Sequence, residues 1–341
     1  MSEQALYRKY RPEAFADLVG QDHVVAALEG ALKEGKLAHA YLFSGGRGTG
    51  KTTSARIIAR GLGTSDSDIY EIDAASNRGI DNMRELRENV STHPFDSKYK
   101  VYIIDEVHML TKEAFNALLK TLEEPPAHVI FILATTELEK VPDTIISRCQ
   151  TFQFRKPSEA ILREVIERTA KKEKVTLGAG VADLIALLAN GSFRDALGTL
   201  QKVISAAGNK VSIDDATRVT GAPPVSIVHD LLEAIARGAL SEALLVVEKS
   251  RASNISSKTL LELLLHSFRR VLLLKVAPQT AKGEMAALSG EEQEFLVRLS
   301  KMESLHLNSG SLVILLDAMS TQRFAYIEQL PLELALMKIL G

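Results

Sequence analysis

A glycine-rich segment at residues 45–52 has the composition and spacing of a phosphate-binding loop. It fits the pattern G-x-x-x-x-G-K-[ST], and its residues are Gly45, Gly46, Arg47, Gly48, Thr49, Gly50, Lys51 and Thr52. Glycines let the backbone fold round an anion, so that amide N–H groups and a helix N-terminus point at phosphate oxygens. Lys51 can then reach the β- and γ-phosphates, and the Thr52 hydroxyl can ligate Mg²⁺. An apolar run precedes the segment and a helical pattern beginning near Thr53 follows it, which is the context that the motif requires.

Two acidic residues, Asp105 and Glu106, follow the β-branched apolar run 101–104. Such a run is typical of a strand buried in a parallel sheet, and open α/β sheets bind ligands at the carboxyl ends of their strands. We expect Asp105 to hold Mg²⁺ and Glu106 to polarise the water that attacks a γ-phosphate. The plainer alternative is that both acids begin a solvated turn. Their position after a phosphate loop favours the second half of a nucleoside triphosphatase site.

Composition limits the possible classes of protein. The chain has 341 residues, of which 46% are hydrophobic and 25% charged, so it can form two or three globular domains. Its net charge of −2 means that any nucleic-acid binding must come from a local basic surface. Cys149 is the single cysteine, which excludes an intramolecular disulfide. We expect Cys149 to be a small buried apolar residue and not a reactive thiol. No signal peptide or spanning helix is evident, so a cytoplasmic protein without membrane contact is expected.

Apolar runs and helical patterns divide the chain into three expected domains. Residues 1–156 alternate strands and helices, which predicts a parallel sheet flanked by helices; the expected strands are 41–43, 69–72, 101–104, 129–133 and 151–154. Residues 157–220 are expected to form helices only, and residues 221–341 form a further all-helical domain. The leucine-rich stretch at 260–268 is either a buried core helix or an oligomer interface, which periodicity cannot separate.

Several further segments together resemble the bacterial DNA polymerase III gamma/tau subunits, the AAA+ ATPases of the sliding-clamp loader. The segments are YRP at 10–12, GQ at 20–21, EIDAAS at 71–76, DEVHML at 105–110, FNALLKTLEEPP at 115–126, LATT at 133–136, SRC at 147–149 and GSFRDAL at 191–197. The resemblance is dense up to about residue 220 and looser beyond it. It implies an AAA+ nucleotide-binding domain, a helical lid and a helical collar for the three expected domains.

The resemblance implies a role for each matching residue. Lys51 and Thr52 match the phosphate and Mg²⁺ contacts, and Asp105 and Glu106 match the metal ligand and the catalytic acid. Thr136, with Thr135, matches the polar residue that positions the attacking water. Arg194 matches the lid arginine that senses the γ-phosphate in the same chain, and Arg148 matches an arginine finger that enters a neighbouring subunit's site. Tyr7, Arg11 and Val19 are candidates for packing round the adenine and ribose.

Each arginine also has a structural interpretation. Arg148 could form a surface ion pair, and Asp195 could neutralise Arg194. Asn77 and Arg78 follow the second strand and open a helix, which suits a nucleic-acid phosphate, and the corresponding stretch lines the DNA chamber in the family. The alternative is that Arg78 is solvated or pairs with Asp81.

The chain departs from the family pattern at residues 61–68, where members usually carry a four-cysteine zinc module. This segment contains neither cysteine nor histidine, so no zinc is expected. The tau-specific tail is also not expected. The resemblance implies ATP and Mg²⁺ as ligands, and it implies delta-like and delta-prime-like subunits, copies of this chain, the sliding clamp and primed DNA as partners. The alternatives are another AAA+ motor, such as a branch-migration helicase, and a replisome scaffold that does not hydrolyse nucleotide.

Overall fold

The chain divides into two compact units, which we describe one at a time. The computed structural model describes residues 4–77, 79, 86, 88–253, 255–285, 288 and 290–341. The first unit comprises Met1–Val165 with Ala189–Gly198, and the second comprises Ile166–Leu188 with Thr199–Gly341. The division into three domains at 156/157 and 220/221 therefore stays a prediction.

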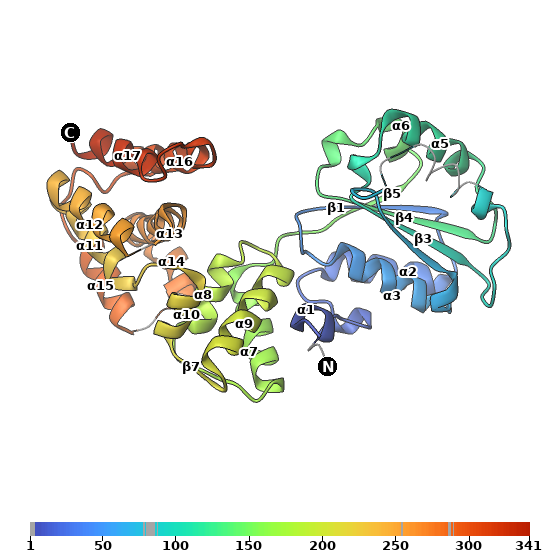
Figure 1. The fold of residues 1–341 in the computed structure, drawn as a ribbon, viewed down its shortest axis with the longest axis horizontal. Coiled ribbons are helices and arrows are strands. Elements are labelled where there is room, and N and C mark those ends of the chain that lie inside the picture. The colour runs from blue at the N-terminus through green and yellow to red at the C-terminus, as the bar shows by residue number, and fades with distance from the viewer. Residues whose placement is uncertain are drawn as a thin grey trace. The chain divides into compact units, whose positions relative to one another are not determined.

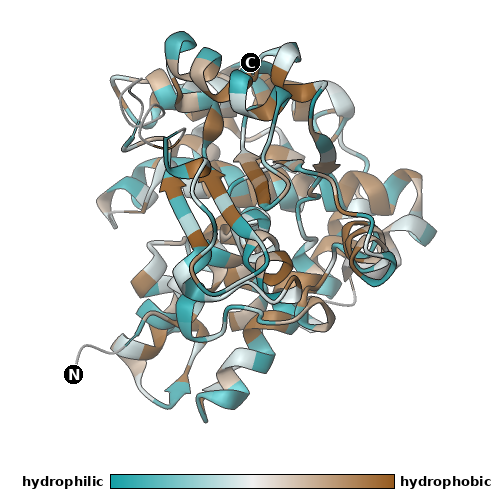
Figure 2. Ribbon diagram, turned by 90° about the vertical axis from the view of Figure 1, so that its right-hand side faces the viewer, coloured by the Kyte–Doolittle hydropathy of each residue, from teal (hydrophilic) through white to brown (hydrophobic). Residues whose placement is uncertain are grey.

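The first unit is built on a five-stranded parallel sheet with the order β2-β3-β4-β1-β5. All five strands expected from the apolar runs are present: β1 (Ala40–Ser44), β2 (Ile69–Asp73), β3 (Lys100–Asp105), β4 (Val129–Thr135) and β5 (Gln150–Gln153). The three central strands are buried almost throughout, because helices cover both faces of the sheet. Figure 2 shows long hydrophobic stretches on the strands and alternating bands along the helices.

Helices form one layer on each face of this sheet (Figure 1). On one face α2 (Asp22–Glu34) and α3 (Lys51–Gly61) pack on Tyr41 and Phe43 of β1, and on the other face α5 (Lys112–Glu123) and α6 (Asp143–Ile146) pack near Leu42. Successive side chains of a strand point to opposite faces, so β1 contributes to both cores. Shorter elements of this unit are α1 (Leu6–Lys9) and the 3₁₀ turns η1 (Phe15–Asp17), η2 (Asp66–Asp68), η3 (Val107–Met109) and η4 (Leu138–Lys140).

Residues 158–220 contain helices and one feature that the helical expectation missed. The helices are α7 (Glu159–Lys172), α8 (Val181–Leu188), α9 (Phe193–Ala207) and α10 (Ile213–Thr220). A two-stranded parallel ladder, β6 (Thr176–Leu177) with β7 (Lys210–Val211), joins two of the connections. Each connection satisfies backbone groups of the other, as Thr176 N–H donates to Asn209 O and Gly178 N–H donates to Val211 O. Runs of two residues are too short to reveal a strand through periodicity.

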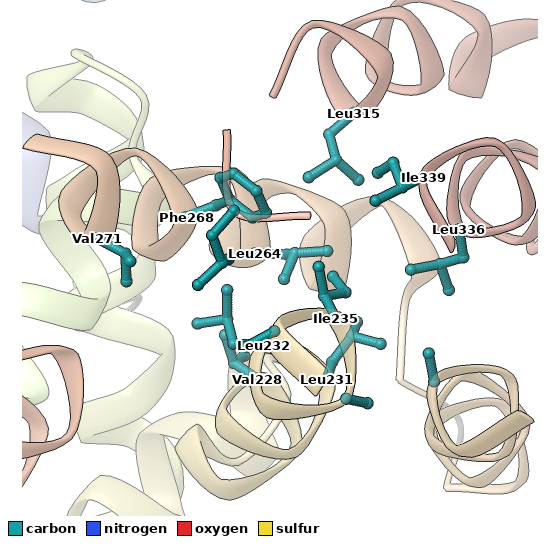
Figure 3. Close-up of a cluster of buried hydrophobic side chains, with 14 of the residues drawn as sticks. Val228, Leu231, Leu232, Ile235, Leu264, Phe268, Val271, Leu315, Leu336 and Ile339 are labelled. Carbon is teal, nitrogen blue, oxygen red and sulfur yellow. The ribbon is translucent and has the colours of Figure 1, made fainter. Parts of the chain in front are cut away.

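The described residues after 220 form helices only, as expected. They are α11 (Val225–Arg237), α12 (Leu240–Ala252), α13 (Ser257–Val276), α14 (Pro278–Met285), α15 (Gly290–Ser300), α16 (Ser309–Thr321), the 3₁₀ turn η5 (Gln322–Phe324) and α17 (Leu330–Leu340). In the leucine-rich α13, Leu260, Leu261, Leu264 and Phe268 are fully buried in the core of the second unit. Figure 3 shows Leu264 and Phe268 within this core. Within this chain, that stretch is therefore a core helix. None of the described helices combines the length and apolarity needed to cross a membrane.

Candidate nucleotide-binding site

The phosphate loop runs from the end of β1 to the first turn of α3, and its glycines are needed where they stand. Gly45, Gly48 and Gly50 have φ values of 146°, 71° and 105°, which L side chains rarely adopt. A Cβ atom on Gly45 would lie 2.4 Å from the carbonyl oxygen of Phe154, and one on Gly48 would lie 2.1 Å from Ser192 Oγ. The loop is thus wedged between the segment after β5 and the start of α9, which fixes its shape.

Lys51 is buried at the first position of α3, and its ammonium group is held by the loop itself. Lys51 Nζ donates to the carbonyl oxygens of Gly45 at 2.7 Å and Gly46 at 2.8 Å. Burial lowers the pKa of Lys51, while the carboxylates of Glu106 and Asp105 act in the opposite direction. Within the loop, Thr49 Oγ1 donates to Gly46 O, whereas Arg47 is exposed and Thr53 is half-buried.

The two acids meet the phosphate loop at the carboxyl end of β3. Thr52 Oγ1 donates to Asp105 Oδ2 at 2.7 Å, and Thr136 Oγ1, just after β4, donates to Glu106 Oε2 at 3.0 Å. Glu106 adopts a left-handed conformation with φ of 49°, which is uncommon for a residue other than glycine. Backbone strain of this kind is concentrated at functional sites. The structure therefore brings together Lys51, Thr52, Asp105, Glu106 and Thr136.

These residues fit a nucleoside triphosphate with Mg²⁺. The Thr52 hydroxyl and the Asp105 carboxylate are oxygen ligands of the type that Mg²⁺ prefers, and they already lie within hydrogen-bond distance of each other. The loop amides lie at the N-terminus of an eleven-residue helix, where the helix dipole favours a bound anion.

Arg194 lies in the first turn of α9, close to the N-terminal segment. Its guanidinium carbon is 5.0 Å from the centroid of the Tyr7 ring. Arg8 and, after it, Arg194 lower the pKa of Tyr7. Burial lowers the pKa of Arg11, and the positive charges of Arg56 and Arg194 add to this effect. Of the residues expected round the base, Tyr7 and Arg11 thus lie near Arg194.

The remaining residue expected near the base, Val19, is half-buried in the turn between η1 and α2. The phosphate loop also contacts α9, because Phe193 N–H donates to the carbonyl oxygen of Gly48 at 3.0 Å.

Arg148 follows α6 and forms an ion pair in this chain. Its Nη2 atom lies 2.7 Å from Glu123 Oε1, its Nη1 atom donates to Thr144 O, and about a third of the side chain is exposed. The neighbouring Cys149 packs against the core beneath α5, and burial raises the pKa of its thiol to about 12. The residue is half-buried, and its contact with this core agrees with the expected apolar role.

The expected DNA contacts are only partly within the described residues. Asn77 is half-buried, and its side-chain amide donates to Asp73 O at 3.0 Å, while Arg78 and Asp81 lie outside the described residues. At the position of the family's zinc module, η2 leads directly into β2. Within the part of the chain that the structure describes, no three His, Cys, Asp or Glu side chains gather as a metal site.

Two residues at the site had no role in the sequence-based expectation. Ser192 packs against Gly48, and His108 lies between Glu106 and Glu137. Both belong to segments that carry the family resemblance, GSFRDAL and DEVHML, which is the only signal that marks them. The contacts of Ser192 with Gly48 and of His108 with Glu137 join distant segments, so spacing in the sequence gives no indication of them.

Known proteins resemble this chain along its whole length. A family model described as DNA polymerase III, delta subunit, matches residues 63–158. The chain is 43% identical over 299 residues to DNA polymerase III subunit tau of Bacillus subtilis, covering 82% of this chain and 53% of that one. It is 33% identical to DNA polymerase III subunit gamma of Buchnera aphidicola, covering 100% of this chain and 99% of that one. The chain therefore spans about half the length of the tau relative and nearly all of the gamma relative.

A solved structure supports the fold. Thermotoga maritima RuvB, a Holliday junction branch migration motor, matches 66% of this chain with a TM-score of 0.53 and 24% sequence identity, covering 79% of that chain. This likeness shows a shared α/β fold with a parallel sheet and nothing about the substrate. The sequence relatives identify the family, which the shared fold alone does not. Sequence identity of one third or more over most of the chain shows membership of the same family. The chain belongs to the DNA polymerase III gamma/tau family.

Proposed function

We propose that the chain binds and hydrolyses ATP as a subunit of a clamp loader, a complex that opens a sliding clamp and places it on primed DNA. The observation that carries the proposal is the meeting of Thr52 with Asp105 and of Thr136 with Glu106 beside the buried Lys51. These side chains come from α3 and from the carboxyl ends of β3 and β4, including the residues that directly follow the two strands. A structural nucleotide site would not require the Glu106 and Thr136 pair.

Each residue has a proposed role in hydrolysis. The loop amides and Lys51 hold the β- and γ-phosphates, and Thr52 and Asp105 hold Mg²⁺, which when bound neutralises charge on the phosphate oxygens. Glu106 accepts a hydrogen bond from the attacking water and takes its proton, while Thr136 keeps the Glu106 carboxylate in place.

The two remaining arginines act on the charge of the transferring phosphoryl group. Arg194 senses it in the same chain, and Arg148 stabilises it in the site of a neighbouring subunit. The Tyr7 and Arg11 side chains pack near the base, with Val19 completing that side of the nucleotide site.

The partners are proposed on family grounds together with the exposed surface. Delta-like and delta-prime-like subunits and copies of this chain would complete the assembly, and Asn77 with Arg78 would contact DNA phosphates. The exposed apolar side chains Val313, Leu316, Leu334 and Met337 on α16 and α17 support contact between subunits. No zinc is proposed, because the segment 61–68 offers no ligand set.

The test compares two substitutions in the chain assembled with its partner subunits, clamp and primed DNA. Glu106→Gln keeps the size of the side chain but removes the base, so ATP binding should persist while turnover falls by about 10²–10⁴-fold. Lys51→Ala removes a phosphate contact and should abolish binding as well. Glu139→Gln, an exposed carboxylate in η4, is the matched control and should behave as wild type.

The outcomes separate the candidate functions. A Glu106→Gln chain that hydrolyses ATP at the wild-type rate would show that Glu106 is not the base. A wild-type complex that binds ATP and loads no clamp, and whose ATPase does not respond to DNA, would contradict the proposed function and favour a scaffold. Unwinding of duplex DNA without any clamp would instead indicate a branch-migration motor.

A further inference from the structure

His108 is a nearly buried imidazole between two carboxylates, and the proposed hydrolysis leaves it without a role. Its Nδ1 atom lies 3.0 Å from Thr135 Oγ1 and 3.5 Å from Glu106 Oε2, and its Nε2 atom lies 3.3 Å from Glu137 Oε1. Only 5% of the side chain is exposed, compared with 30% for Glu106 and 39% for Glu137. The ring therefore separates Glu106 from Glu137.

The backbone places the ring there through the turn that follows Glu106. Glu106 caps η3 in its left-handed conformation, and Met109 N–H donates to Glu106 O at 2.9 Å. Val107 is fully buried in the core beneath, which anchors the turn. The turn and its core contact thus fix His108 relative to the backbone of Glu106.

The neighbours of the ring determine which nitrogen carries hydrogen. An ionised carboxylate only accepts hydrogen bonds, so Glu137 favours a hydrogen on Nε2 of His108. In the neutral ring Nδ1 is then an acceptor, and it takes the hydroxyl hydrogen of Thr135. The oxygen of that hydroxyl accepts from the backbone N–H of Glu137 at 3.0 Å. The Glu106 carboxylate, whose Oε2 atom lies 3.5 Å from Nδ1, takes its hydrogen bond from Thr136 Oγ1 and none from the ring.

We propose that His108 is a positioning residue that holds Glu106 in the orientation needed to activate water. The Thr135 hydroxyl donates to His108 and is therefore not available to Glu106. The hydroxyl that donates to Glu106 is that of the adjacent Thr136. The rigid ring also fills the space beside the Glu106 carboxylate, which restricts its rotamers. The inference rests on the proposed function, because the proposed function makes Glu106 the general base.

The first experiment measures steady-state ATPase kinetics of the full chain in its complex with clamp and primed DNA. His108→Phe keeps a ring but no hydrogen bond, and should lower kcat roughly 10- to 100-fold, as displacement of a reacting group by about 1 Å does. KM for ATP should stay within about twofold of wild type, because phosphate contacts are untouched. His108→Asn places an amide near the Nδ1 position and should recover part of kcat.

The matched control is His128→Phe. His128 directly precedes β4 and so lies at the opposite end of this strand from Thr135. Its ring contacts the carbonyl oxygen of Thr92, far from Glu106, so the substitution should leave kcat unchanged. Wild-type kcat for His108→Phe would overturn the proposal. So would an Asn variant as slow as the Phe variant.

The second experiment asks whether His108 acts through Glu106. In a Glu106→Gln background, adding His108→Phe should lower the residual turnover by less than twofold, since residues that act as a unit are not additive. A full additional loss would show that His108 acts elsewhere and would overturn the inference.

A third readout needs no turnover. Nitrogen NMR of the histidine rings in the nucleotide-free chain should show hydrogen on Nε2 of His108 and a change in its signals on Glu106→Gln, with His128 unaffected. A ring without hydrogen on Nε2, or signals insensitive to Glu106→Gln, would overturn the assignment. Failure of the proposed function is distinguishable, because it would appear as absent ATPase in the wild-type complex.

Discussion

At the scale of single residues, the phosphate loop is held together by hydrogen bonds from the side chains of Lys51 and Thr49. The ammonium group of Lys51 rests on the carbonyl oxygens of Gly45 and Gly46, so its buried charge is compensated by hydrogen bonds. A side chain held in this way loses less conformational freedom when a ligand replaces these carbonyls than a free lysine would. Preorganisation of this kind reduces the entropic cost of ordering a site on binding.

Cys149 provides a residue-scale prediction of chemical reactivity. Burial raises the pKa of its thiol to about 12, so almost no thiolate is present at pH 8. Alkylation by iodoacetamide at pH 8 should therefore be slower than that of an unfolded cysteine by on the order of 10³-fold, given an ordinary pKa near 8.5. Mass spectrometry of the native and denatured chain measures both rates. Equal rates would show that the thiol is accessible and ionised.

The residues that sequence can predict at the site are those with a local pattern. Lys51 and Thr52 follow from the glycine-rich spacing, and Asp105 and Glu106 follow from an apolar strand with acids at its end. The approach of Tyr7 to Arg194, by contrast, joins the two ends of the first unit's sequence. The contact between His108 and Thr135 depends on β3 and β4 being neighbours in the sheet, which no local spacing reveals.

At the scale of elements, the five strands of the sheet could be predicted because each has a β-branched or aromatic apolar run. Their spatial order could not, since it depends on which strands pair with one another although they lie far apart in the sequence. The connection from α3 to β2 is the clearest case, because η2 occupies the place of a zinc module. There the buried Asp68 carboxylate accepts hydrogen bonds from the backbone N–H groups of Phe95, Asp96 and Ser97. A carboxylate thus ties this connection to the loop before β3.

This arrangement predicts a local change in stability. Asp68→Ala leaves buried N–H groups without their acceptor, so the free energy of opening of the 95–97 loop should fall by about 1–3 kcal/mol. Hydrogen exchange at the amides of residues 95–97 measures it. Asp66→Ala, an exposed acid of the same turn, is the matched control and should leave exchange unchanged. Unchanged protection in Asp68→Ala would contradict the account.

The same contact predicts a pH dependence. Burial alone would raise the pKa of Asp68, but the three N–H donors outweigh it and hold the pKa below its ordinary value of 3.8. A carboxyl group with a lowered pKa in the folded chain stabilises the fold above its ordinary pKa. That contribution disappears as pH falls through the lowered value. The difference in amide protection between wild type and Asp68→Ala should therefore persist at pH 5 and vanish in stronger acid.

At the scale of the whole molecule, two surface features suit contact with other subunits. In the second unit, α16 and α17 bury Leu315 and Leu336 in the core but expose other apolar side chains. In the first unit, Arg148 is a half-buried arginine at the surface, and its ion-pair partner Glu123 is exposed. An exposed ion pair contributes at most about 1 kcal/mol, so Arg148 can leave Glu123 at little cost. Under the proposed function, both features would gain a role in an assembly of subunits.

The shared-site model makes a prediction that only an assembly can test. Arg148→Ala should bind ATP almost normally yet hydrolyse it poorly in the complex, because an arginine finger is worth roughly 10³–10⁵ in rate. Mixing Arg148→Ala chains with Lys51→Ala chains should restore part of the DNA-stimulated activity, since some interfaces then pair an intact Lys51 site with an intact Arg148. Glu123→Ala is the matched control, because it breaks the ion pair while leaving the guanidinium free, and it should hydrolyse ATP at least as fast as wild type. If Arg148→Ala alone is as active as wild type, or if no mixture recovers activity although both variants assemble, Arg148 serves only to bind Glu123 and Thr144 within its own chain.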